Sequence, residues 1–163
     1  RAALAKGRRK YNMDPMKHSP SHLPDPKLDA QFYDGVMIKR LLAWGIDVVV
    51  VLILTLGVIV GSLGLLAFVF PAVIFLVNLG YRIFTIQNKS ATIGMRLTGI
   101  ELRNAQGERF SLNEAMIHTG LFILIFISFL GIIANMLAMF LNDRGQGLHD
   151  MLLGSVAINR PED

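Results

Sequence analysis

Charged residues are absent from a long central stretch of the chain. After Asp47, no charged residue or histidine occurs until Arg82. At ~1.5 Å per residue, a helix of that run would be about 50 Å long, whereas the hydrocarbon core of a membrane is ~30 Å thick. One straight crossing is therefore excluded, and the small residues of Gly61-Ser-Leu-Gly64 predict a tight reversal. We expect two transmembrane helices at about residues 38–60 and 65–84, the second with a kink at Pro71.

A second apolar block is predicted as a helical segment at about residues 113–141. It begins with Ser111-Leu-Asn-Glu114, the pattern of a capping box. Its length fits neither one crossing of ~20 residues nor two of ~40. If it crosses once, the C-terminal tail lies outside; if Ser128-Phe-Leu-Gly131 divides it into a re-entrant helix pair, the tail returns to the cytoplasmic side. Both alternatives stay open, and we favour the return.

The connection between the two apolar blocks is polar and predicts β-structure. Ile100 and Leu102 alternate with polar residues, and a turn at residues 104–107 precedes renewed alternation at Phe110. This pattern predicts a β-hairpin at about residues 97–112. A further alternating segment, at about 155–159, needs a partner because a lone strand is unstable in water, and the available partner is this hairpin, which favours the returning tail. The fold class that we predict is an all-α membrane protein with a small cytoplasmic β-hairpin or three-stranded sheet.

Composition and charge support a membrane protein and suggest its orientation. The 163 residues have a mean hydropathy of +0.50 and include no cysteine. Basic residues gather before the first helix and between the two apolar blocks, and such residues favour the cytoplasmic side. We therefore expect a multi-pass protein with a cytoplasmic N-terminus.

Residues 1–35 are expected to form a flexible polar tail, because four prolines interrupt residues 15–26. The first twelve residues carry five basic side chains and no acid. Met13 is a candidate natural start, so whether residues 1–12 are native stays open. The basic arm has no interleaved aromatic residues, and we do not expect nucleic acid as a partner.

The first candidate site lies at the start of the first predicted membrane helix. Arg40 and Asp47 are two helical turns apart and share a face with Trp44. An aspartate in the membrane costs ~2.5–3.5 kcal/mol at the helix centre and less near the interface. Side chains lean toward the N-terminus of a helix, so Asp47 leans toward the level of Arg40 while Arg40 leans away from it. A direct Arg40–Asp47 pair is therefore strained, and a third partner is expected. A structural ion network, an ion or proton site and a partner contact are the open interpretations.

Asp150 is the third candidate, and it follows His149 in the sequence Gln146-Gly-Leu-His-Asp150. It reaches the level of Arg40 only if the tail is cytoplasmic. A histidine can titrate near neutral pH or bind metal, but an interfacial hydrogen bond is the more frequent role of a lone histidine such as His149 or His118. We predict no metal site and no cofactor.

Three segments together resemble the RDD family of small bacterial membrane proteins. They are Arg40 to Asp47, Thr92-Ile-Gly-Met-Arg96-Leu-Thr-Gly99-Ile, and Gln146 to Gly154. The resemblance covers about residues 36–160 and implies that the family's arginine and two aspartates are Arg40, Asp47 and Asp150. Trp44, Arg96 and His149 are candidate supporting residues. Met95 departs from the pattern, because many members carry lysine there.

The resemblance implies a bacterial inner (cytoplasmic) membrane and, for some members, cation/proton antiport. Our first functional hypothesis is monovalent-cation/proton transport through an Arg40–Asp47–Asp150 network in a homo-oligomer, since so few membrane segments cannot enclose a path. The alternative is an accessory or assembly subunit packed against a larger membrane complex. An enzyme is not expected, because the chain has no cysteine, HExxH or phosphate-binding glycine loop.

Overall fold

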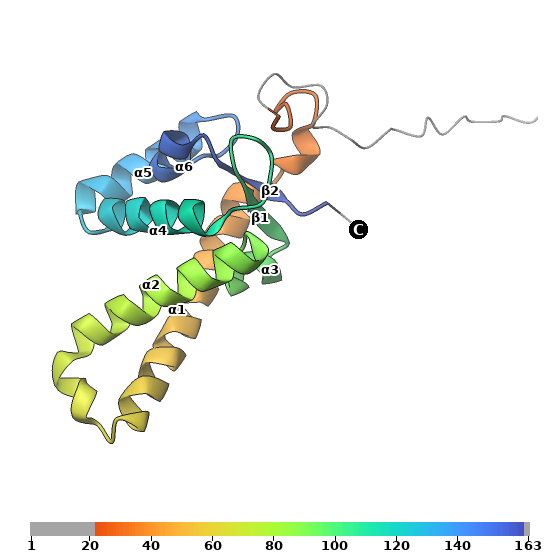
Figure 1. Cartoon of the computed structure of the whole chain (residues 1–163). Coiled ribbons are helices and arrows are strands. Elements are labelled where there is room, and N and C mark those ends of the chain that lie inside the picture. The colour runs from red at the N-terminus through yellow and green to blue at the C-terminus, as the bar shows by residue number, and fades with distance from the viewer. Residues whose placement is uncertain (1–21, 162–163) are drawn as a thin grey trace, which may run out of the picture.

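The computed structural model describes residues 22–161, and its main feature is an apolar helical hairpin (Figure 1). Helix α1 spans Val36–Gly61, a short 3₁₀ helix η3 spans Leu65–Val69, and α2 spans Phe70–Lys89. The two long helices have the length and composition to cross a membrane, which confirms the predicted hairpin. The predicted interruption near Pro71 is present as the change from η3 to α2 at residues 69–70. Pro71 lies in the first turn of α2, where its missing N–H breaks no helical hydrogen bond.

The second apolar block forms two short helices, α4 (Leu112–Phe126) and α5 (Phe129–Leu141), with a bend of 116° between them. The predicted capping box at Ser111 and Glu114 starts α4. Ser128 starts α5, because its hydroxyl accepts a hydrogen bond from the Gly131 N–H. If this bent pair is counted as one span, the described residues contain three candidate spans instead of two.

The small sheet has two strands among the described residues. Strand β1 (Ile100–Arg103) pairs antiparallel with β2 (Val156–Asn159), and Ile100 lies opposite Asn159. The predicted hairpin at 97–112 and the three-stranded sheet are therefore wrong. Instead of a third strand, Ser90 accepts two hydrogen bonds from this region. Its carbonyl accepts from Leu102 N–H at 2.6 Å, and its hydroxyl accepts from Phe110 N–H at 2.6 Å.

The C-terminal segment returns to the beginning of α1. After α5, the short helix α6 (Leu148–Leu153) packs on α4 and α5 and leads into β2. The Lys39 ammonium donates to Asn159 Oδ1 at 2.7 Å, so β2 lies beside the first turn of α1. Of the two arrangements left open by the sequence, the described residues adopt the one in which the tail returns.

Residues 22–35 are packed, in contrast to the flexible tail expected there. Leu23 is buried with Val156 and Ile158 of β2, and two aromatic side chains of the same segment cover them. Asn159 also donates to the carbonyl of Gln31 at 2.8 Å. The remainder of the predicted tail, residues 1–21, lies outside the described residues.

The main core lies where α1, α2, α3 (Ile93–Leu97), β1 and α4 meet. It consists of small and medium apolar side chains: Val36, Ala43, Ile86, Ala91, Met95, Ile100, Leu102, Phe110, Ala115 and Ala157. The far halves of α1 and α2 are different, because side chains such as Ile53 in α1 and Leu76 in α2 are about two-thirds exposed, at 64% and 63%. An apolar surface of this kind is suited to lipid.

Candidate functional site

One of the two predicted aspartates, Asp150, is enclosed at the centre of a buried ion cluster. Arg40 Nη2 lies 2.5 Å from Asp150 Oδ2, and His118 Nε2 lies 2.9 Å from Asp150 Oδ1. The Gly147 N–H also donates to Asp150, at 3.0 Å. The Asp150 side chain has no exposed surface. This carboxylate therefore joins α1, α4 and α6, and its own oxygens are fully engaged.

His149 completes the cluster as a neutral ring. Its Nδ1 lies 3.2 Å from Asn135 Oδ1, an acceptor, so Nδ1 carries the hydrogen and Nε2 has a lone pair. That Nε2 lies 3.5 Å from Arg40 Nη2. Burial lowers the pKa of His149 to about 3. Although burial opposes ionisation of Asp150, the nearby Arg40 guanidinium holds the pKa of that carboxyl well below its usual range.

The spacing of this cluster also resembles that of a metal site. The ligand atoms of His118, His149 and Asp150 all lie within 4.8 Å of one another. However, the Arg40 guanidinium already neutralises Asp150 and presents a fixed positive charge beside His149. A divalent cation would have to displace that guanidinium, so the donor set fits a buried ion pair better than a metal centre. We name this group (Arg40, His118, His149, Asp150) the arginine clamp.

Asp47 lies outside the arginine clamp and has its own set of donors. Its Oδ1 accepts from the Tyr81 hydroxyl at 2.5 Å and from Gly94 N–H at 2.8 Å. Its Oδ2 accepts from the Thr92 hydroxyl at 2.6 Å. Asp47 thus ties α1 to α2 and to the start of α3. Three charge-assisted hydrogen bonds compensate for the loss of water around a buried carboxylate.

Gly94 is required for this contact. A Cβ atom at position 94 would lie 2.1 Å from the backbone oxygen of Ala43 and 2.8 Å from Asp47 Oδ1. Only glycine lets the backbone of α3 approach α1 closely enough to donate to Asp47. The segment Thr92-Ile-Gly-Met is therefore a docking motif for the carboxylate of α1.

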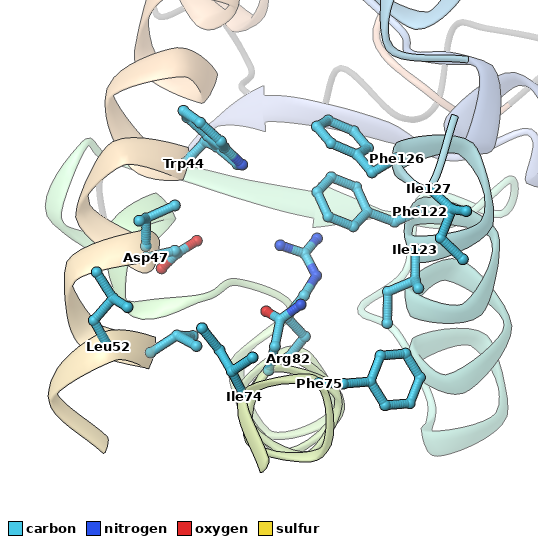
Figure 2. Close-up of a pocket in the computed structure, with 13 residues that line it drawn as sticks. Trp44, Asp47, Leu52, Ile74, Phe75, Arg82, Phe122, Ile123, Phe126 and Ile127 are labelled. Carbon is cyan, nitrogen blue, oxygen red and sulfur yellow. The ribbon is translucent and has the colours of Figure 1, made fainter. Parts of the chain in front are cut away.

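Asp47 also faces a cavity between α1, α2 and α4, with a volume of about 390 Å³ (Figure 2). Apolar and aromatic side chains, including Trp44, form most of its wall, and its hydrogen-bonding groups include Asp47, Asn78 and Arg82. In Figure 2 the Arg82 guanidinium lies between the α1 side and Phe122 of α4. We name this space the Asp47 cavity.

Arg82 is buried in the wall of the Asp47 cavity without a carboxylate partner. Only 4% of the residue is exposed, and its Cζ lies 3.8 Å from the centroid of the Phe122 ring, a cation–π contact. Within residues 22–161, its Nε has no hydrogen-bond partner and no carboxylate lies within 4.0 Å of it. A buried guanidinium with a spare donor is costly, and such a group inside a membrane helix indicates function.

The sequence-predicted residues are thus divided among three places. Arg40, Asp150 and His149 meet in the arginine clamp, whereas Asp47 and Trp44 line the Asp47 cavity. The predicted three-residue network is not a single cluster. The sixth candidate, Arg96, belongs to neither group and lines a separate basic cavity.

Sequence reasoning missed the donors of Asp47 and the role of Arg82. Asn78 and Arg82 are four residues apart, hence on one helical face, and Arg82 ends the uncharged run. That signal could have identified Arg82. The contact between Asp47 and Thr92 spans 45 residues, and no local pattern reveals it.

Comparison with known proteins gives one match. The family model for the RDD family matches residues 35–154, which include both carboxylates, Arg82 and the docking motif of α3. No curated protein and no solved structure matches the chain. Because the match covers most of the sequence, the chain belongs to the RDD family.

Proposed function

We propose that this membrane protein exchanges protons for a monovalent cation at Asp47, as a homo-oligomer. The observation that carries the proposal is that Asp47 faces the Asp47 cavity together with Asn78 and Arg82. Carboxylates within membrane helices commonly mark ion pathways and proton relays. Asp150 does not suit this role, because its oxygens are held by Arg40, His118 and the backbone of α6.

Competition for one negative charge gives the exchange mechanism. A proton on Asp47 neutralises the carboxylate, and a bound cation does the same, so binding of either opposes binding of the other. Carboxylate and amide oxygens are suitable ligands for a hard cation, and Asp47 and Asn78 supply both kinds in the wall of the Asp47 cavity. If Asp47 holds a proton and a cation in turn, the proton and the cation are carried in opposite directions.

Arg82 acts in this mechanism as an internal competitor. When the cavity holds no cation, the guanidinium compensates the charge of Asp47 from across the cavity. The Phe122 ring stabilises the guanidinium in this position, and a cation bound at Asp47 would repel it. The aromatic ring therefore holds the arginine close to Asp47 without a direct ion pair.

Occupancy of Asp47 is also coupled to the position of α3. The carboxylate accepts hydrogen bonds from Thr92 and Gly94, both in the docking motif. Protonation converts an acceptor-only carboxylate into a group that also carries a donor, which weakens that set of contacts. We infer that α3 loosens from α1 in the protonated state.

The oligomer follows from the small number of membrane helices. The two candidate spans within residues 22–161, or three with the bent pair, cannot enclose a path, and in that part of the chain the Asp47 cavity is lined by α1, α2 and the α4 end of the bent pair. A second copy would supply the missing wall. We place this assembly in the bacterial inner membrane with a cytoplasmic N-terminus, which reporter fusions at both ends would test.

The test is a flux assay on the reconstituted protein. Vesicles containing the purified chain and a pH-sensitive dye receive a gradient of sodium or potassium, and cation-driven proton movement is recorded. Asp47→Asn should abolish the movement, because an amide neither exchanges a proton nor carries charge. Glu108→Gln, which neutralises an exposed carboxylate elsewhere, should leave it unchanged. Equal flux in the wild type and Asp47→Asn would contradict the proposal.

An accessory role is the second candidate, and it is favoured by the exposed apolar surface of the hairpin. Leu63 and Phe68, at the reversal between α1 and α2, are 92% and 91% exposed. A larger membrane complex could cover these side chains as well as lipid could. Purification in a mild detergent separates the two roles: co-migration with a larger complex supports the accessory subunit, and a stable homo-oligomer supports transport.

A further inference from the structure

A second cavity, of about 310 Å³, lies away from both carboxylate sites and is strongly basic. Its lining residues come from the end of α2, from α3, from β1, from the loop after β1 and from the residues that follow β2. Five basic side chains and one carboxylate line it: Lys89, Arg96, Arg103, Arg109, Arg160 and Glu101. They come from five separate segments of the chain, so the fold gathers positive charge that the sequence distributes over 72 positions, from 89 to 160.

The one carboxylate positions two of these arginines without neutralising the cavity. Glu101 is 1% exposed; it forms an ion pair with Arg103 and lies 3.7 Å from Arg160 Nε. Arg103 Nε is buried without a hydrogen-bond partner among residues 22–161. Within the same residues, Lys89, Arg96 and Arg109 have no carboxylate within 4.0 Å. The cavity therefore has spare donors and an excess of positive charge.

The cavity adjoins the end of a candidate membrane span. Lys89 is the last residue of a candidate membrane span, so the cavity begins where the hydrocarbon region ends. Large apolar side chains are exposed near it in sequence: Phe84, in the last turns of α2, at 69%, and Leu97, beside Arg96, at 71%. A ligand with a phosphate group and apolar chains would contact both kinds of surface.

We propose that this cavity binds the phosphate headgroup of an anionic phospholipid. Basic pockets at the cytoplasmic ends of membrane helices suit such headgroups, and arginine pairs with phosphate oxygens through two parallel N–H donors. Arg96, which lies outside the arginine clamp, is one of the residues that would bind the phosphate. The inference does not depend on ion exchange at Asp47.

The test measures lipid affinity of the full chain. Protein purified and delipidated in a mild detergent is titrated with phosphatidylglycerol, with phosphatidylcholine as the neutral control, and binding is followed by native mass spectrometry. Arg96→Gln and Arg109→Gln should each weaken phosphatidylglycerol binding about fivefold, the contribution of one basic residue at an anionic surface. Lys27→Gln removes an exposed positive charge outside the cavity and should not change the affinity.

Further variants separate this site from a general charge effect and from the proposed transport site. Arg96→Lys keeps the charge but loses the two parallel donors, so its affinity should lie between those of Arg96→Gln and the wild type. Asp47→Asn should leave phosphatidylglycerol binding unchanged. Equal losses in Arg96→Gln and Lys27→Gln, or equal binding of the two lipids, would overturn the proposal. Binding of inorganic pyrophosphate with no preference for phosphatidylglycerol would overturn it too, because the ligand would then be a soluble phosphate.

Discussion

The two aspartates of this chain are both buried, yet their surroundings differ in one respect. Asp150 is surrounded on every side by a guanidinium, an imidazole and a backbone amide. Asp47 has donors on one side, from Tyr81, Thr92 and Gly94, and a cavity on the other. A carboxylate that borders no cavity can hold helices together, but there is no room beside it for an ion.

The two arginines show the same contrast. Arg40 lies 2.5 Å from a carboxylate, whereas Arg82 rests on an aromatic ring with its Nε unpaired among the described residues. Breaking the first pair leaves an uncompensated buried charge. Moving the second arginine breaks no ion pair, so Arg82 can respond to a change at Asp47. This contrast is why the proposed exchange is assigned to the Asp47 cavity and a structural role is proposed for the arginine clamp.

The largest effect is expected for Asp150→Asn, which leaves Arg40 as a buried unpaired cation. We expect a loss of about 3–5 kcal/mol in the free energy of unfolding. Thermal melting in detergent measures it. Combining it with Arg40→Met should recover much of the loss, because the unpaired charge is then removed as well. A single variant as stable as the wild type would show that the clamp does not hold α1, α4 and α6 together.

Gly94→Ala tests the docking of α3 on α1 and should cost about 3 kcal/mol, the upper part of the range for overpacking. The added Cβ would lie 2.1 Å from the Ala43 carbonyl oxygen, so α3 has to move away from Asp47. Gly120→Ala is a matched control in α4, where a Cβ has no neighbour within 4 Å. If the two variants melt alike, the close approach at Gly94 is unimportant.

Thr92→Val removes one donor from Asp47 and should cost about 2 kcal/mol, as for other hydrogen bonds to charged groups. The same hydroxyl also accepts from Met95 N–H at the start of α3. Thr98→Val is the control, because the Thr98 hydroxyl donates only to backbone carbonyls of its own helix. The comparison fails if both substitutions have the same effect on melting.

Acidification should weaken the arginine clamp through His149. The pKa of His149 is about 3 in the folded chain and ~6.5 in the unfolded chain, so between these values the unfolded state binds more protons. Stability therefore falls as pH decreases, by about 1.4 kcal/mol from pH 7.5 to pH 5.5. Asp150 adds a loss in the same direction below its unfolded pKa of ~3.9. His149→Asn should melt with a smaller dependence on pH; an unchanged slope would exclude His149 as the cause.

The sequence was sufficient to predict the elements that depend on local pattern. The uncharged run predicts the hairpin of α1 and α2, and the spacing of Ser111 and Glu114 predicts the start of α4. The alternation at about 155–159 predicts a strand that needs a partner, and β2 does pair with β1. The alternation around Phe110 predicts a second hairpin strand, which does not form among the described residues. Phe110 is closer in sequence, but Val156 to Asn159 occupy the edge of β1.

The site was predictable only in part, for a related reason. A charged residue in an apolar helix is conspicuous in sequence, so Arg40 and Asp47 were found. Their partners lie far along the chain: Asp150 is 110 positions from Arg40, and Gly94 is 47 positions from Asp47. The resemblance named the distant Asp150 as a member of Arg40's network, and the two do pair, but it placed Asp47 in the same network, whereas Asp47 accepts from Tyr81, Thr92 and Gly94. In the structure each charge is compensated by a different element.

Trp44 provides the most direct test of the difference between the two aspartates. It is the one tryptophan of the chain and lines the Asp47 cavity, so its fluorescence reports on that space. Sodium or potassium is titrated at constant ionic strength, with choline as the balancing cation. We predict a saturable change in emission for the wild type and none for Asp47→Asn. A response that persists in Asp47→Asn, or a wild type that does not respond to either cation, would contradict the account.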